Sequence, residues 1–227
     1  GIVNITGTFT KSGTGDVNLG SNSFIVGQLT LSAGTINNAA DDNGTWTIAG
    51  DVSISGTLKA TSGLFYVGGN WTNSGTFNHA SGTVTFNGTG ESIITGTNIF
   101  YNLKCITPGK IITFPASTLT TISGTLTLEG SLANHIILRS SGTGEGNEFD
   151  ISVHAVKDAQ GNDYVEYLTV NDSDATGDAA PIPAYNSTGT NTTGWNFCAN
   201  ITIEGIAYQS NGSSPLTGKN IALRVNG

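Results

Sequence analysis

A short acidic segment in the second half of the chain has the residue order that begins a calcium-binding loop. It reads DSDATGD over residues 172–178, so Asp172 and Asp174 alternate with small residues ahead of a glycine. In calcium loops such alternating carboxylates turn several oxygen atoms toward one cation. The glutamate that closes these loops at the twelfth position is replaced by Pro183. Asp172, Asp174 and Asp178 are therefore candidate calcium ligands, and a solvated acidic turn between two strands is the alternative.

Other residues with catalytic chemistry are scattered along the chain. Glycoside hydrolysis needs two carboxyl groups roughly 5 to 9.5 Å apart, and Glu145, Glu148 and Asp150 follow Arg139. A surface ion pair of Arg139 with an acid is the simpler interpretation of this group. No Gly-x-Ser-x-Gly, His-Glu-x-x-His or Walker-type motif occurs. We therefore predict no catalytic residue, no required cofactor and no enzymatic activity.

The sequence contains two cysteines, Cys105 and Cys198. Neither belongs to a Cys-x-x-Cys motif or lies near a histidine in the sequence, which argues against zinc. A single disulfide between Cys105 and Cys198 is a candidate cross-link. Two buried free thiols are the alternative.

The charge of the chain limits its classes of partner. The 227 residues carry 8 Lys and Arg against 16 Asp and Glu, a formal net charge of −8. Nucleic-acid binding needs a concentrated basic surface, which these scattered cations do not supply. No apolar run approaches the roughly 20 residues that a membrane-spanning helix needs. We predict no nucleic-acid partner and no membrane insertion.

Glycine spacing indicates which elements position these residues. Glycines recur at steps of mostly six or seven residues through much of the first hundred positions. Residues 44–62 (GTWTIAGDVSISGTLKATS) align glycine on glycine with residues 63–81 (GLFYVGGNWTNSGTFNHAS), and Trp46 falls over Phe65. Internal repetition of this length is typical of solenoids.

Each step of the repeat alternates as a short strand does. In GTWTIAG, Trp46 and Ile48 alternate with threonines, so both apolar side chains face the same side. Three such strands form a triangular coil, whose apolar side the next coil must bury. We predict an all-β parallel β-helix of about 19–22 residues per coil, with Trp46, Ile48, Phe65 and Val67 inside. A β-sandwich is the alternative, although hairpin signals are few.

The second half of the repeat is less regular. From about Asn98, strands such as KIITFP and NHIILRSS are separated by turns of varied length. The segment KDAQGND over residues 157–163 predicts an outward loop. Trp195 and Phe197 could plug the open end of the solenoid. The predicted β-helix spans residues 1–197.

Several segments resemble a known architecture. The segments NLKCITPGKIITFPASTLTTISGTLTLEG, NHIILRSSGTG, VEYLTVNDSDATGD and NTTGWNF resemble the right-handed parallel β-helix segments of large bacterial adhesin-like, β-strand-repeat surface proteins. This resemblance implies a right-handed β-helix in an extracellular or cell-surface setting. It implies no particular ligand, and Cys105 departs from the pattern, which favours an apolar or small polar residue there.

The composition changes after Phe197. Residues 198–227 read as strand, proline-containing turn and strand, and they resemble the opening of an immunoglobulin-like or carboxypeptidase-regulatory-like β-domain. Thirty residues fall below the roughly 40 at which a domain usually folds alone. We expect a short C-terminal β-hairpin or partial β-sandwich domain, or a tail that exchanges strands with another copy. End-to-end stacking of copies is a further expectation.

The two functional hypotheses follow from this organisation. The first is a non-catalytic structural or adhesive module of an extracellular surface protein or self-assembling surface filament. The alternative is a carbohydrate-binding or carbohydrate-cleaving β-helix protein, with surface glycans as partners. Exposed aromatic side chains would support the alternative, and the candidates are Tyr66, Tyr101, Tyr164, Tyr167 and Tyr185.

Overall fold

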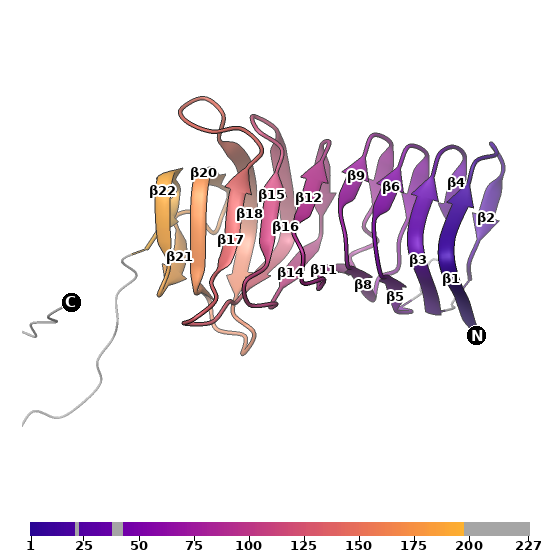
Figure 1. Cartoon of the computed structure of the whole chain (residues 1–227), viewed down its shortest axis with the longest axis horizontal. Coiled ribbons are helices and arrows are strands. Elements are labelled where there is room, and N and C mark those ends of the chain that lie inside the picture. The colour runs from indigo at the N-terminus through magenta and orange to yellow at the C-terminus, as the bar shows by residue number, and fades with distance from the viewer. Residues whose placement is uncertain (21–22, 38–42, 198–227) are drawn as a thin grey trace, which may run out of the picture.

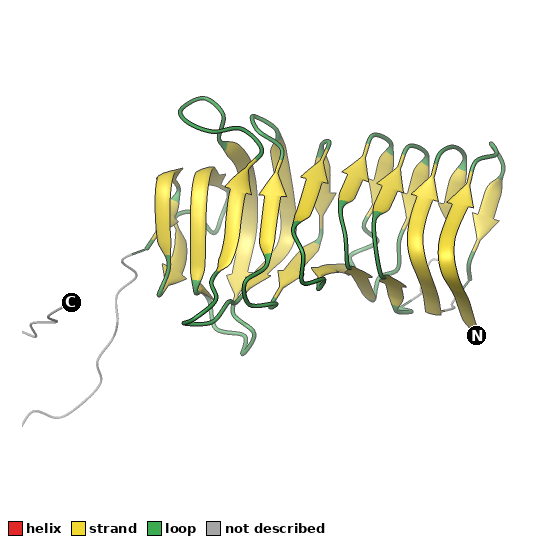
Figure 2. Ribbon diagram, in the orientation of Figure 1, coloured by secondary structure: helices red, strands yellow, loops and turns green. Residues whose placement is uncertain are grey.

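The protein is a β-solenoid of stacked coils (Figures 1 and 2). The computed structural model describes residues 1–20, 23–37 and 43–197. These residues form 23 strands and no helix, and neighbouring strands in each face pair in parallel. The coils run along one axis from β1 and β2 to β21 and β22 (Figure 1). This arrangement confirms the predicted all-β parallel β-helix.

Three faces make up the solenoid, and the longer strands bend from one face into the next. The first face contains the first halves of β1 (Ile2–Lys11) and β3 (Ser23–Leu31), then β5 (Trp46–Ile48), β8 (Leu64–Val67), β11 (Thr83–Phe86), β14 (Asn102–Cys105) and the second halves of β16 (Leu119–Leu128) and β18 (Phe149–Lys157). Near its end lie β19 (Val165–Glu166), β21 (Ile182–Tyr185) and β23 (Trp195–Asn196).

The other two faces are built in the same way. The second contains the second halves of β1 and β3, then β6 (Val52–Ile54), β9 (Trp71–Asn73), β12 (Ser92–Thr95), β15 (Ile111–Phe114), β17 (Ile136–Ser140) and the first halves of β20 (Leu168–Thr176) and β22 (Thr188–Thr193). The third contains β2 (Asp16–Asn18), β4 (Thr35–Asn37), β7 (Thr57–Lys59) and β10 (Thr76–Asn78), then β13 (Asn98–Phe100) and the remaining halves of β16, β18, β20 and β22.

The core consists of inward side chains stacked from coil to coil. Phe24, Trp46 and Phe65 are each fully buried, and their rings follow one another at centroid distances of 5.3 and 5.4 Å. Ile48 and Val67 are buried beside them. The four residues that the repeat predicts inside are therefore confirmed there. Aromatic contacts of this kind add roughly 0.5 to 1.5 kcal/mol each beyond the area they bury.

Coil length changes along the solenoid, as the sequence predicts. Trp46 and Phe65 pair at a separation of 19 residues, whereas Leu103 and Leu126 pair at 23. Leu138 and Val170 pair at 32. The predicted 19–22 residues per coil therefore describe the regular first half, and later coils add residues in loops that project beyond the strands (Figure 1).

A buried polar network fills the place where the third face is interrupted between β10 and β13. The Oδ1 of Asn98 accepts hydrogen bonds from the indole of Trp71 at 2.8 Å and from the amide of Asn73 at 3.3 Å. The amide of Asn98 donates to the carbonyl of Gly96 at 2.8 Å. Asn98 is fully buried, so these bonds offset the free-energy cost of removing its amide from water.

Aromatic side chains lie at the C-terminal end of the described solenoid. Trp195 and Phe197 pack against the core, and their rings are nearly parallel at 6.1 Å. The indole of Trp195 donates to Ser173 Oγ at 3.0 Å. This placement agrees with the expected plug at the open end. Residues 198–227, with the predicted hairpin, partial domain or strand-exchange tail, lie outside the described residues.

Two glycines in one turn test the importance of close stacking. A Cβ atom at Gly88 would overlap the carbonyl oxygen of Gly68 on the preceding coil, whereas one at Gly90 would meet nothing within 4 Å. We expect Gly88→Ala to lower the free energy of unfolding by about 1–3 kcal/mol. Gly90→Ala should change it by about 0.5 kcal/mol or less. Equal effects of the two variants in urea unfolding would contradict the close stacking.

Candidate functional site

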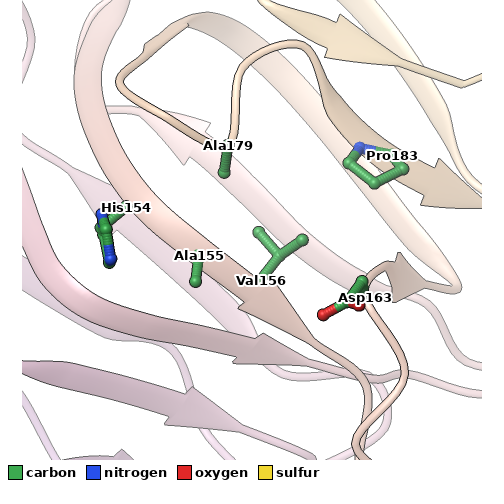
Figure 3. A pocket seen from close by; sticks show the side chains of 6 residues that line it. All are labelled: His154, Ala155, Val156, Asp163, Ala179 and Pro183. Carbon is green, nitrogen blue, oxygen red and sulfur yellow. The ribbon is translucent and has the colours of Figure 1, made fainter.

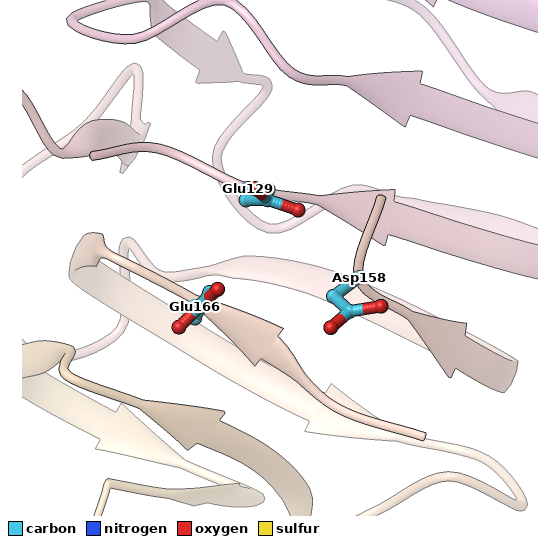
Figure 4. Close-up of side chains that lie close together, drawn as sticks. All are labelled: Glu129, Asp158 and Glu166. Carbon is cyan, nitrogen blue, oxygen red and sulfur yellow. The ribbon is translucent and has the colours of Figure 1, made fainter. Parts of the chain in front are cut away.

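Three acidic side chains meet on the outer side of the first face (Figure 4). Glu129 follows β16, Asp158 follows β18, and Glu166 ends β19. One carboxylate oxygen of each lies within 4.8 Å of the others. Glu129 and Glu166 are brought together by a parallel bridge between their backbones. This group, the acidic cluster, is the candidate site within the part of the chain that the structure describes.

The carboxylate of Asp158 holds the loop that follows it. Its Oδ1 accepts the backbone N–H groups of Gln160 at 2.9 Å and Asn162 at 2.7 Å, and its Oδ2 accepts the Asn162 side chain at 2.6 Å. Burial raises the pKa of Asp158, but hydrogen bonds from Asn162, Tyr164 and Gln160 outweigh this effect and leave the pKa below its usual value. Asp158 therefore stabilises the loop as a carboxylate.

Glu129 anchors the same loop from the coil before it. Its Oε2 accepts the backbone N–H of Ala159 at 2.7 Å. Glu166 differs, because burial and the nearby charges of Glu129 and Asp158 raise its pKa, against a lowering hydrogen bond from Asn186. Carboxyl groups with opposed pKa shifts are suited to acid and base roles or to a cation. Two of the three carboxylates, however, are already engaged by loop amides.

A pocket of about 260 Å³ lies near this loop (Figure 3). Its walls are formed by His154, Ala155, Val156, Asp163, Ala179 and Pro183. His154 contacts Asp178 at 2.7 Å, and Lys157 contacts Asp163 at 2.6 Å. The rings of Tyr164 and Tyr185 lie 4.4 Å apart. Tyr164 follows the lining residue Asp163 directly, and Tyr185 comes two residues after the lining residue Pro183. The pocket thus combines apolar walls with charged groups.

The predicted calcium ligands have separate partners in the structure. Asp172 Oδ1 accepts the Asn191 amide at 2.8 Å, and both residues have left-handed backbones, with φ of 52° and 50°. Asp174 accepts the hydroxyl of Thr193, its neighbour on the next coil, and Asp178 contacts His154. Among the described residues, the acidic cluster is the one group of three or more possible metal ligands whose ligand atoms lie within 4.8 Å of one another. The calcium site remains a prediction, and these separate partners favour its alternative, a solvated acidic turn.

The other candidates from the sequence are also placed. Arg139 pairs with Glu91 at 2.8 Å and donates to Thr113 at 2.9 Å, so it forms a surface ion pair. Glu148 accepts Asn191 at 2.9 Å and Gly146 at 2.8 Å.

Cys105 is fully buried between Phe86 and Leu128, and burial raises its pKa to about 11. Its thiol is therefore protonated and unreactive at neutral pH. Cys198 lies outside the described residues, so the disulfide remains a prediction.

Sequence reasoning missed the acidic cluster. The outward loop over residues 157–163 is predicted correctly from its turn-forming residues. Asp158, which holds this loop, is the one member of the cluster that the prediction indicates. The meeting of Glu129, Asp158 and Glu166 depends on coils of unequal length, for which the sequence gives no register.

The fold defines the protein as a parallel β-solenoid. The chain matches no protein-family model, no curated protein and no solved structure. The described residues contain no helix long and apolar enough to cross a membrane. Function must therefore be argued from the solenoid and its surface.

Calcium binding can be tested directly at the predicted ligands. Because Asp172, Asp174 and Asp178 each have a separate partner, we expect millimolar calcium to leave the melting temperature within about 1 °C of its value in chelator, where a saturated tight site would raise it by several degrees. A rise of several degrees that Asp174→Asn removes and Glu129→Gln preserves would contradict this expectation. A rise that Glu129→Gln removes and Asp174→Asn preserves would place the ion in the acidic cluster.

The raised pKa of Glu166 predicts a pH-dependent effect on stability. An acid with a raised folded-state pKa opposes folding once ionised, so the penalty appears as pH rises above the usual value of 4.5. Glu166→Gln should raise the melting temperature by about 1–2 °C near pH 7, because it removes a partly buried charge and its repulsion by Glu129 and Asp158. One like-charge contact alone costs of order 0.5 kcal/mol.

The gain in melting temperature from Glu166→Gln should vanish near pH 3.5, where the carboxyl group of wild-type Glu166 is largely protonated. The exposed Glu145→Gln serves as the control. A gain that persists in acid would contradict the electrostatic cause.

Proposed function

We propose that this chain is a non-catalytic structural and adhesive module of an extracellular surface protein or surface filament. The observation that carries the proposal is the continuous stacking of nine coils, counted by the strands of the second face from β1 to β22. Eight spacings of about 4.8 Å give a rod roughly 38 Å long. Backbone hydrogen bonds run along this rod, so it resists extension and local opening.

The outer surface of the rod suits exposure to water and contact with other polymers. On the second face, one outward row consists of hydroxyl side chains over five successive coils: Thr10, Thr30, Ser53, Thr72 and Thr95. Hydroxyl groups hydrogen-bond readily with water and with polar polymers. Such rows carry no charge, so their contacts depend little on salt.

The acidic cluster also supports a structural role. Asp158 and Glu129 position the loop over residues 158–163 by accepting its backbone N–H groups. A catalytic pair would need carboxyl groups free to reach a substrate. These two carboxylates therefore hold the loop in place.

Carbohydrate binding is a second candidate, favoured by one observation. Tyr164 and Tyr185 form a close aromatic pair. Asp163, next to Tyr164, and Pro183, two residues before Tyr185, line the pocket. Apolar walls with carboxylates at the edge can contact both the C–H groups and the hydroxyls of a sugar ring. Cleavage would further require a mobile proton at Glu166, the acid whose pKa is raised.

Cell labelling and sugar assays separate these functions. Antibodies against the rod should label intact, unpermeabilised cells that produce the parent protein, and the isolated chain should release no reducing ends from polysaccharides. Labelling only after permeabilisation would contradict the proposal. Glycan binding that Tyr185→Ala abolishes and Tyr66→Ala preserves would favour the second candidate instead.

A further inference from the structure

The N-terminal coil exposes side chains whose partners on the next coil are buried. Val3, Ile5 and Phe9 point inward but are only partly buried. Their partners on β3, Phe24, Val26 and Leu29, are at most 1% exposed.

β1 and β2 also form the edges of their sheets within the described residues, so the outer backbone groups of β1 have no strand partner there. An open strand edge above apolar side chains is a surface for pairing with another strand.

The opposite end of the rod is covered differently. The ring of Phe197 occupies the space where a Cβ atom of residue 189 would lie. Trp195 is held next to it by its bond to Ser173. The two ends are therefore not equivalent, and the N-terminal end is the one that lacks a cover among the described residues.

The sequence beyond Phe197 contains a segment with the pattern of β1. Residues 201–209 read ITIEGIAYQ, and residues 3–11 read VNITGTFTK. Apolar residues occupy the first, third and seventh positions of both segments, and glycine occupies the fifth. Nine residues after the end of each segment, Gly218 corresponds to Gly20 in the same alignment. Residues 201–209 thus have the alternation that this solenoid uses for a strand bending from its first face into its second.

This segment cannot reach β1 of its own chain. Residue 201 lies four residues beyond Phe197, a span of at most about 14 Å. The first and last coils are separated by roughly 38 Å. A second copy can place its segment on β1 without this limit.

We propose that residues 201–209 of one copy pair in parallel with β1 of a second copy. In this register Ile201 lies over Val3, Ile203 over Ile5 and Ala207 over Phe9. The neighbour thereby covers the exposed apolar side chains and satisfies the outer edge of β1. Since each copy offers one such segment and one such edge at opposite ends, the contact is head-to-tail and repeats into an open filament.

This inference names a partner for the proposed structural module and rests on that function. Cell-surface labelling does not require assembly of the isolated chain, so a chain that stays monomeric overturns the filament while the module function stands. Conversely, labelling confined to the cell interior overturns the module while assembly can still be measured.

The test compares variants of the whole 227-residue chain by light scattering and electron microscopy over a range of concentrations. Wild type should form a series of oligomers. Ile203→Asp and Ile5→Asp should each weaken association roughly 100-fold or more, because each places a charge in an apolar contact. Thr202→Asp, which points outward in the proposed register, should change association by less than about threefold.

A peptide separates this contact from a general loss of folding. A fluorescent peptide of residues 199–212 should bind the monomeric Ile203→Asp chain, whose β1 is intact, and should not bind the Ile5→Asp chain. Circular dichroism should show the same strand signal for both variants. A wild-type monomer at all concentrations, a closed dimer, or assembly that Ile203→Asp leaves unchanged would overturn the proposal.

Discussion

The structure depends on the in-register stacking of each coil on the next. A single coil leaves its backbone N–H and C=O groups and its inward side chains exposed, and the adjacent coil satisfies both at once. Phe24, Trp46 and Phe65 show the packing side of this constraint, since each ring contacts the ring one coil away. The interior therefore admits little variation, and differences between coils are confined to the outer rows, the corners and the inserted loops.

Outward loops add chemistry to this scaffold without breaking the stack. Lengthening a surface loop costs little additional entropy, so the coil from Val156 onward can leave the first face and return at Val165. The return sets Glu166 beside Glu129, and Asp158 closes the loop between them. The like charges that result are tolerated because backbone amides neutralise part of their field. The loop, and not the repeat, creates the acidic cluster and the nearby pocket.

Periodic features could be predicted from the sequence, and features that join coils of different length could not. Trp46 and Phe65 share a column because both belong to the 19-residue repeat. The same spacing pairs Asp172 with Asn191. The resemblance of residues 172–178 to a calcium loop does not predict this pair, because local residue order does not indicate a partner on the next coil. Cys105 departs from the resembled pattern yet lies in the core, since a thiol packs as a small apolar group.

The ends of a solenoid follow a different rule from its flanks. Each internal coil is covered on both sides, whereas a terminal coil has one side for which the repeat supplies no partner. Phe197 and Trp195 partly cover one end with aromatic rings, while the inward side chains Val3, Ile5 and Phe9 at the other end are only partly buried. A rod with unlike ends has a direction, and contacts between unlike ends preserve that direction through an assembly. Continuity of the stack across copies would then carry force along the same backbone hydrogen bonds that hold one copy together.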